Sequence, residues 1–206
     1  MNCLICSAPF LEAPSWQRLF TMKQSETTCE KCKSKFEKAT DKEHETDWIG
    51  TIYEGALDSL TSIYSYNMWM KQVYQQYKFQ HDVELAKVFA ADFSHLKKNK
   101  NLIVPIPLHQ DMLKSRTFSQ VDQLLLAARV PFTQVLTKIT NSSQIKKSKK
   151  ERIESEINYS VCADVQSQTI LLVDDLYTTG TTLRHIAFIL KEAGAQEVNA
   201  ITLIRA

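Results

Sequence analysis

Glycine is scarce in this sequence, with four residues among 206, and long apolar runs are lacking. No run approaches the roughly 20 apolar residues that a membrane-spanning helix needs, so we expect no membrane insertion. The N-terminus lacks a basic segment followed by an apolar stretch, which argues against a secretory signal and favours a cytoplasmic location. Because glycines are so few, the positions of Gly180 and Gly194 are informative.

A strong charge of one sign is also lacking, since 25 basic and 23 acidic residues leave a net charge of +2. Any attraction to nucleic acid must therefore come from local clustering. The five cysteines are an odd number, which argues against a closed disulfide framework. The composition changes along the chain and predicts two parts. They are a metal module with its linker over residues 1–47 and an α/β domain over residues 48–206.

Four of the five cysteines form two Cys-x-x-Cys pairs, Cys3 with Cys6 and Cys29 with Cys32. Two intervening residues let one tight turn aim both sulfurs at one metal, and two such turns complete a tetrahedral site. The pattern predicts a zinc-ribbon-like module with a structural zinc ion. Reduced structural thiols or a redox pair are the alternative interpretation.

Apolar periodicity predicts strands and helices in alternation from Trp48 onward. The continuous run at residues 169–173 is typical of a central parallel strand that is buried on both faces. A helix follows, with Leu183, Ile186 and Leu190 on one stripe and Gly194 placed to end it. A further strand at residues 198–204 completes a βαβ unit, and the fold class is therefore α/β.

The segment between the predicted strand and the next helix has the composition of a phosphate-binding loop. Two carboxylates follow the strand, and a hydroxyl-rich loop with one glycine leads into the helix. A helix N-terminus offers unpaired N–H groups and a positive dipole end, and glycine permits close approach and positive φ. An ordinary capped turn is the alternative. The residues concerned are Asp174, Asp175, Thr178, Thr179, Gly180, Thr181 and Thr182.

This segment resembles the 5-phosphoribosyl-1-pyrophosphate (PRPP) motif of the type I phosphoribosyltransferases. The resemblance implies the type I phosphoribosyltransferase fold, a parallel sheet flanked by helices. It also implies a PRPP ligand that binds together with Mg²⁺. By the same resemblance, Asp174 and Asp175 contact the ribose hydroxyls, while the loop of residues 178–182 surrounds and binds the 5′-phosphate. By the same resemblance the loop after the first core strand faces the pyrophosphate, with His109 and Arg116 as candidate contacts.

Besides the cysteine module, the sequence contains five further motifs: Tyr77-Lys78-Phe79, Pro105-Ile106-Pro107-Leu108-His109, Arg116-x-Phe118-x-Gln120, Thr140-x-x-x-Gln144 with Arg152, and Leu203-Ile204-Arg205. Together these motifs, spread over nearly the whole chain, resemble the ComF family of competence proteins. Such proteins serve natural transformation beside a helicase-like ATPase partner, in the handling of incoming single-stranded DNA.

Residues 138–152, here called the basic stretch, hold six cations against one anion, a net charge of +5. A solvated face is one interpretation, and an electrostatic track for a nucleic-acid backbone is the other. Trp69, Tyr74 and Tyr77 are possible stacking platforms, although their helical spacing favours core packing. The candidate DNA contacts in the basic stretch are Lys146, Lys147, Lys149, Lys150 and Arg152.

Two functions are compatible with these motifs. In the first, the chain is a DNA-uptake accessory that binds single-stranded DNA and a phosphoribosyl ligand. In the second, it is a working transferase that joins PRPP to an acceptor. A retained motif does not by itself decide whether transfer occurs, because one fold hosts many functions. No catalytic residue is assigned from the sequence.

Overall fold

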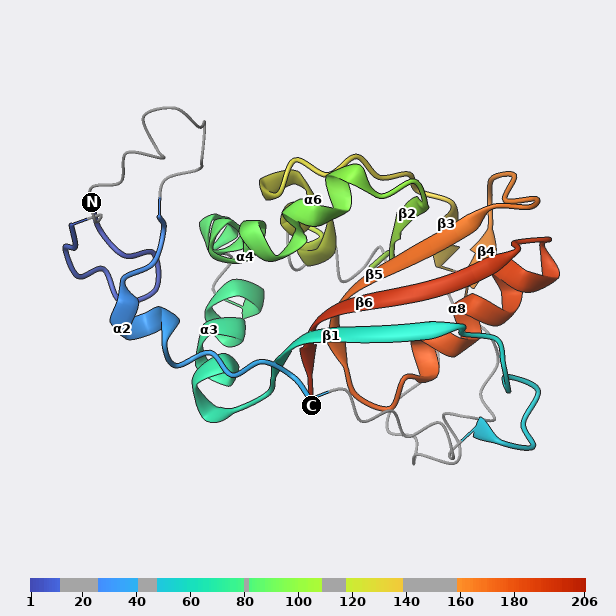
Figure 1. Ribbon diagram of the computed structural model, residues 1–206, viewed down its shortest axis with the longest axis horizontal. Helices are drawn as coiled ribbons and strands as arrows, with labels where there is room; N and C mark the ends of the chain where they lie inside the picture. The colour runs from blue at the N-terminus through green and yellow to red at the C-terminus, as the bar shows by residue number, and fades with distance from the viewer. Residues whose placement is uncertain (12–25, 41–47, 80–81, 109–117, 139–158) are drawn as a thin grey trace.

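The computed structural model of the chain describes residues 1–11, 26–40, 48–79, 82–108, 118–138 and 159–206 (Figure 1). Within these residues the main sheet has four strands in the order β1-β6-β5-β2, and all neighbours are parallel. The predicted α/β class is confirmed. The four strands are β1 (Ser59–Ser65), β2 (Leu102–Pro105), β5 (Thr169–Tyr177) and β6 (Glu197–Arg205).

Helices cover both faces of the sheet. One face packs on α3 (Met68–Phe79), α4 (Ala86–Phe93) and α6 (Gln120–Ala127). Of the short 3-10 segments, η2 (Val83–Leu85) leads into α4, and η3 (Ser94–Lys98) follows α4 and precedes β2. The other face packs on α8 (Thr181–Glu192) and on a small antiparallel pair, β3 (Leu136–Lys138) with β4 (Tyr159–Val161). Of the helices among the described residues, none is long and apolar enough to cross a bilayer.

Strand β5 lies inside the sheet and is buried on both faces, as its apolar run predicts. Ile170 and Leu172 pack toward α8, whereas Leu171 and Val173 pack toward the three-helix side. The expectation that the strand stops before the acidic pair is wrong, because β5 continues to Tyr177. Its pairing with β2 ends at Val173, but β6 supplies a hydrogen-bonding partner as far as Tyr177.

The helix predicted after the phosphate loop is α8, and its apolar stripe is buried. Gly194 follows its last turn with a φ of 95°. Its N–H donates to the carbonyl of Lys191, and the N–H of Ala195 donates to that of Leu190. These bonds satisfy carbonyls that the helix end leaves open, so the predicted C-terminal cap is confirmed.

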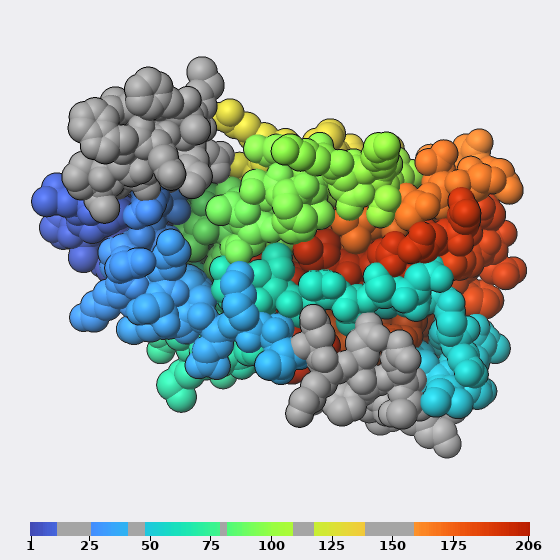
Figure 2. Space-filling view, viewed as in Figure 1, coloured from blue at the N-terminus to red at the C-terminus, as the bar shows by residue number. Residues whose placement is uncertain are grey.

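The cysteine-bearing N-terminal residues lie at one end of the molecule, beside α3 and α4 (Figures 1 and 2). A strap of residues 35–39 joins them to the sheet. Ala39 N–H donates to the Ile63 carbonyl of β1, and Phe36 packs against three core rings. The linker predicted over residues 38–47 is therefore docked on the core at its start, while residues 41–47 lie outside the described part.

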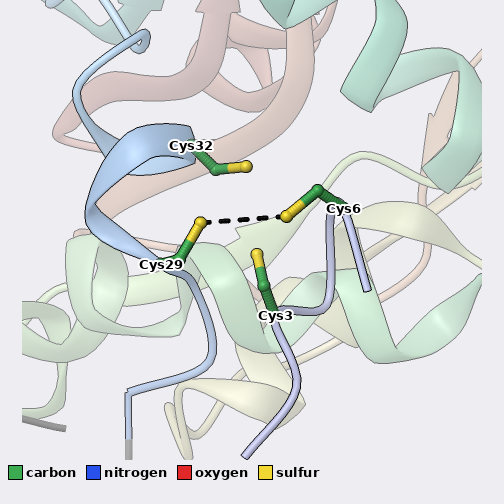
Figure 3. Close-up of side chains that lie close together, drawn as sticks. All are labelled: Cys3, Cys6, Cys29 and Cys32. Atoms are coloured by element: carbon green, nitrogen blue, oxygen red, sulfur yellow. Dashed lines mark hydrogen bonds between the residues drawn. The ribbon is translucent and has the colours of Figure 1, made fainter. Parts of the chain in front are cut away.

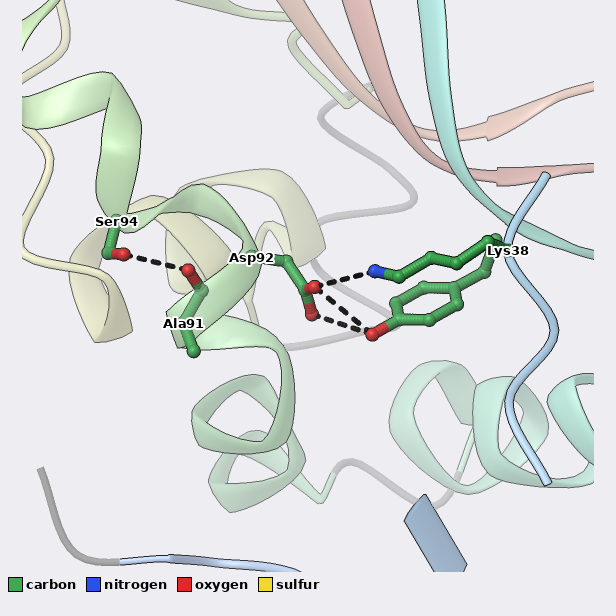
Figure 4. A network of polar contacts seen from close by, with 5 residues as sticks. Lys38, Ala91, Asp92 and Ser94 are labelled. Atoms are coloured by element: carbon green, nitrogen blue, oxygen red, sulfur yellow. Dashed lines mark hydrogen bonds and ion pairs between the residues drawn. The ribbon is translucent and has the colours of Figure 1, made fainter. Parts of the chain in front are cut away.

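A polar cluster fastens the same strap to α4 (Figure 4). Lys38 Nζ donates to Asp92 Oδ1 at 3.0 Å, and the Tyr64 hydroxyl donates to the same carboxylate at 2.9 and 3.1 Å. Lys38 Nζ also lies 4.1 Å from the centroid of the Tyr64 ring. The strap thus connects the cysteine module to strand β1 and to helix α4.

Candidate functional site

The predicted phosphate loop joins the end of β5 to the start of α8. Gly180 begins the helix with a φ of 74°, in the left-handed region that favours glycine. A Cβ built there would lie 2.5 Å from Nη1 of Arg184 and 2.7 Å from the Tyr177 ring. The position therefore requires glycine for both conformation and space, as the sequence predicted.

The first turn of α8 exposes the unpaired N–H groups of a helix start beside a hydroxyl-rich loop. Its helical bonding starts with the Arg184 N–H and the Gly180 carbonyl, so the N–H groups ahead of it have no partner within the helix. The Thr179 and Thr181 hydroxyls are 2.9 Å apart, and Thr178 and Thr182 are exposed. The positive dipole end and these donors suit a phosphate group.

Asp175 belongs to a network that crosses from β5 to α3. The Tyr74 hydroxyl donates to Asp175 Oδ2 at 2.8 Å, and Lys78 Nζ donates to the Tyr74 hydroxyl at 2.6 Å. Lys78 Nζ also lies 3.8 Å from Asp175 Oδ2, with both side chains less than a fifth exposed. Asp175 is thus a carboxylate fixed by two groups of one helix.

Asp174 directly precedes Asp175 in the chain but lies in different surroundings. Its Oδ1 accepts the N–H of Asp175 at 2.8 Å. Burial and the Asp175 charge raise its pKa well above the usual range, while Lys78 opposes the shift. Burial and the Asp174 charge also raise the pKa of Tyr159 in β4. Both causes disfavour the ionised form of Asp174, and a cation bound beside the acidic pair would counteract them.

Sequence reasoning did not assign Tyr74 or Lys78 to the site. Lys78 does stand in the Tyr77-Lys78-Phe79 motif, which was the only available signal. Tyr74 and Tyr77 are buried, so the core-packing interpretation of these two rings is confirmed. Trp69 is half-buried and packs against the same cluster.

Several predicted site residues lie outside the described residues. These are His109 and Arg116 on the expected pyrophosphate side and all five candidate DNA contacts of the basic stretch. Lys138, at the start of that stretch, is described and ends β3, with its Nζ 5.2 Å from the Tyr159 ring centroid. The assignments to Arg116 and the basic stretch remain predictions.

The four paired cysteines come together as the spacing predicted (Figure 3). Their sulfurs lie within 4.8 Å of one another, and those of Cys6 and Cys29 are 3.8 Å apart. A tetrahedron with Zn–S bonds of about 2.3 Å has sulfur–sulfur edges of roughly 3.8 Å. The cluster therefore has the ligand type, number and spacing for one zinc ion. Cys29 precedes the short helix α2 (Glu30–Lys33), which presents Cys32.

Backbone donors prepare one of these sulfurs as a thiolate. Burial by itself would raise the pKa of Cys3, but hydrogen bonds from the backbone of Cys29, Cys6 and Ile5 lower it to about 6. Zinc binds the thiolate form, so N–H groups aimed at a sulfur favour a metal ligand. All four cysteines are unbridged.

Comparisons with known proteins find relatives of this chain. The phosphoribosyl transferase domain family matches residues 115–206. Competence protein ComFC of Bacillus subtilis is 33% identical, covering 98% of this chain and 94% of its own. Competence protein ComFC of Streptococcus pneumoniae is 33% identical and covers 100% of both. A hypoxanthine phosphoribosyltransferase structure from Staphylococcus aureus is 16% identical over 61% of this chain and 64% of its own, at a TM-score of 0.40.

Proposed function

Since this chain belongs to the ComFC family of competence proteins, we propose that it is a cytoplasmic accessory of natural transformation. In this proposal it binds incoming single-stranded DNA and works beside a helicase-like ATPase of the same system. Its phosphoribosyl transferase domain binds PRPP at the loop between β5 and α8. The cysteine module contributes stability through a structural zinc ion.

The observation that carries the proposal is the pairing of an anion-binding helix terminus with two fixed carboxylates. Gly180 opens the α8 terminus to a phosphate, and Asp174 and Asp175 stand a few residues ahead on β5. A ligand that fits must carry a phosphate and, close to it, either hydroxyl groups or a bound cation. A phosphorylated ribose such as PRPP has all of these.

Each described residue has a distinct role in this proposal. The free N–H groups and threonine hydroxyls of the loop bind the 5′-phosphate, while the acidic pair accepts hydrogen bonds from the ribose hydroxyls. Tyr74 and Lys78 hold Asp175 in position. Magnesium bound with PRPP would neutralise its pyrophosphate oxygens, and the acidic pair offers the hard oxygen donors that this ion prefers, directly or through water.

A working transferase is the second candidate. What favours it is the raised pKa of Asp174, because carboxyls with perturbed pKa values gather where ligands react. Such an enzyme would position PRPP and stabilise the positive charge that develops on the sugar as pyrophosphate leaves. Release of pyrophosphate in the presence of candidate acceptors distinguishes this function from binding alone.

Calorimetric titration with Mg²⁺ and PRPP tests the proposal, on the wild type and on Asp174→Asn/Asp175→Asn, with and without a single-stranded oligonucleotide. We expect the wild type to bind PRPP and the double variant to lose at least about tenfold in affinity, because charge-assisted hydrogen bonds are lost. A wild type that binds DNA but not PRPP would leave the loop as a scaffold and the protein as a DNA-handling module.

A further inference from the structure

Helix α8 begins without the groups that usually stabilise a helix start. Its N-cap is Gly180, which has no side chain that could form a capping hydrogen bond. Its first turn contains no acidic residue. Ordinary helices place Ser, Thr, Asp or Asn at the cap and carboxylates in the first turn, where they complement the positive dipole end. This terminus is therefore left electropositive.

A buried cation adds to that charge. The Arg184 side chain belongs to the first turns of α8 and is only 6% exposed. Its Nη1 is buried and has no hydrogen-bond partner in the part of the chain that the structure describes. Within the described residues no carboxylate forms an ion pair with it. The place where a Gly180 Cβ would lie is 2.5 Å from this Nη1, so the guanidinium is aimed at the phosphate loop.

Such an arrangement is costly for the protein in the absence of a ligand. A buried charge without a counter-charge is unfavourable, and a cation near a helix N-terminus opposes the helix dipole. Trp48 offsets part of this cost, because the guanidinium lies 5.0 Å from the centroid of its ring. Stacking on an aromatic ring explains how Arg184 is tolerated, but a neutral side chain would pack there without the charge penalty.

We propose that Arg184 supplies the positive charge of the phosphate site and so strengthens its hold on a phosphate group. The loop itself is built of threonine and glycine and contributes no formal charge. Arg184 acts through the loop backbone at Gly180, as a fixed cation behind the anion-binding N–H groups. This inference rests on the proposed phosphate-binding function of the same loop.

The test compares Arg184→Gln, which removes the charge, with Arg184→Lys, which keeps it. Lys191→Met is the matched control, because it removes one positive charge from the far end of the same helix. Inorganic phosphate is titrated at constant ionic strength, and its affinity is taken from the rise in Tm that binding produces. Calorimetry with Mg²⁺ and PRPP is run in parallel on each protein.

We expect Arg184→Gln to weaken phosphate binding by at least about tenfold, while Arg184→Lys and Lys191→Met stay close to the wild type. Without phosphate, Arg184→Gln should melt no lower than the wild type, because it removes a buried cation that has no ion-pair partner among the described residues. Equal phosphate affinity in Arg184→Gln and wild type would overturn the inference. If Arg184→Gln does not fold, the wild-type Arg184 Nε–H resonance decides, since it must shift along the phosphate isotherm.

The two proposals fail in different ways. A wild type that binds inorganic phosphate through Arg184 but does not bind PRPP refutes the PRPP proposal and supports the role of Arg184. A wild type that binds PRPP with the same affinity as Arg184→Gln refutes the role of Arg184 and supports the PRPP proposal. A wild type that binds neither phosphate nor PRPP refutes both.

Discussion

The ion pair between Lys78 and Asp175 should contribute far more to stability than the surface pairs of this protein. Its atoms are 3.8 Å apart, and the two side chains are only 16% and 13% exposed. Lys78 Nζ also donates to the Tyr74 hydroxyl and lies 4.7 Å from the centroid of that ring. Lys87 and Glu84 form a closer pair, but they are 53% and 60% exposed.

The magnitudes differ because solvent screens only the second pair. At an effective dielectric constant of about 20, two charges 3.8 Å apart attract by roughly 4 kcal/mol before desolvation is counted. Removing one member of a buried pair typically costs about 3–5 kcal/mol, since its partner stays buried and unpaired. For Lys78→Met we expect a loss of about 3 kcal/mol, or a fall in Tm of roughly 6–12 °C. For the control Lys87→Met the loss should be below about 1 kcal/mol.

Urea unfolding and thermal melts of these variants measure the effect, and pH supplies a second signature. The folded-state pKa of Asp174 is raised, so stability falls as pH rises from the unfolded value through the folded one. Lys78 opposes that rise, so Lys78→Met should raise the folded-state pKa of Asp174 further and widen the pH range over which stability falls. Its stability deficit should be small near the ordinary pKa of aspartate and grow toward neutral pH.

A double-mutant cycle with Asp175→Asn completes the test. If the two side chains are coupled, Lys78→Met/Asp175→Asn should be destabilised by clearly less than the sum of the single variants. A loss below about 1 kcal/mol for Lys78→Met, or strict additivity in the cycle, would refute the reasoning.

Three further predictions address the acidic pair, the metal centre and the basic stretch. Asp174→Asn should raise Tm at neutral pH, because it removes a carboxylate whose ionised form is disfavoured in the folded protein. The same variant should weaken PRPP binding by at least about tenfold. A lower Tm would contradict the electrostatic argument. The purified protein should contain about one zinc per chain. Cys29→Ser should lose that zinc and speed amide exchange around the cysteines but not in β5 and β6, and unchanged metal content would disprove the four-cysteine site. Replacing Lys146, Lys147, Lys149 and Lys150 by glutamine should reduce the salt slope of single-strand binding by about 0.7 per lysine that contacts the strand. An unaltered slope would favour the solvated-face interpretation.

The parts of the site that are contiguous in sequence were predictable. The acidic pair, the glycine and the helix after them form one short string, and each element has a local physical reason. The two cysteine pairs are separated by a longer loop, but their internal spacing already dictates how each turn aims its sulfurs. Local chemistry is sufficient in both cases.

The parts that depend on tertiary packing were not predictable. Tyr74 and Asp175 are 101 residues apart, and only the packing of α3 against β5 brings them together. The continuation of β5 through two aspartates contradicts their low strand propensity, and it occurs because β6 pairs with that segment. Likewise, the stripe of α8 predicts which residues are apolar but not that Trp48 covers Arg184.

The strap of residues 35–39 has a consequence for self-association. Strand β1 is an edge of the main sheet, and an uncovered edge offers backbone groups to another chain. The strap occupies part of that edge: Ala39 N–H donates to the Ile63 carbonyl, and Ser65 N–H donates to the Glu37 carbonyl. Because the strap continues directly from the cysteine cluster, a zinc ion bound there would also help to keep this edge from pairing with strands of neighbouring molecules. Zinc loss should therefore promote aggregation through β1.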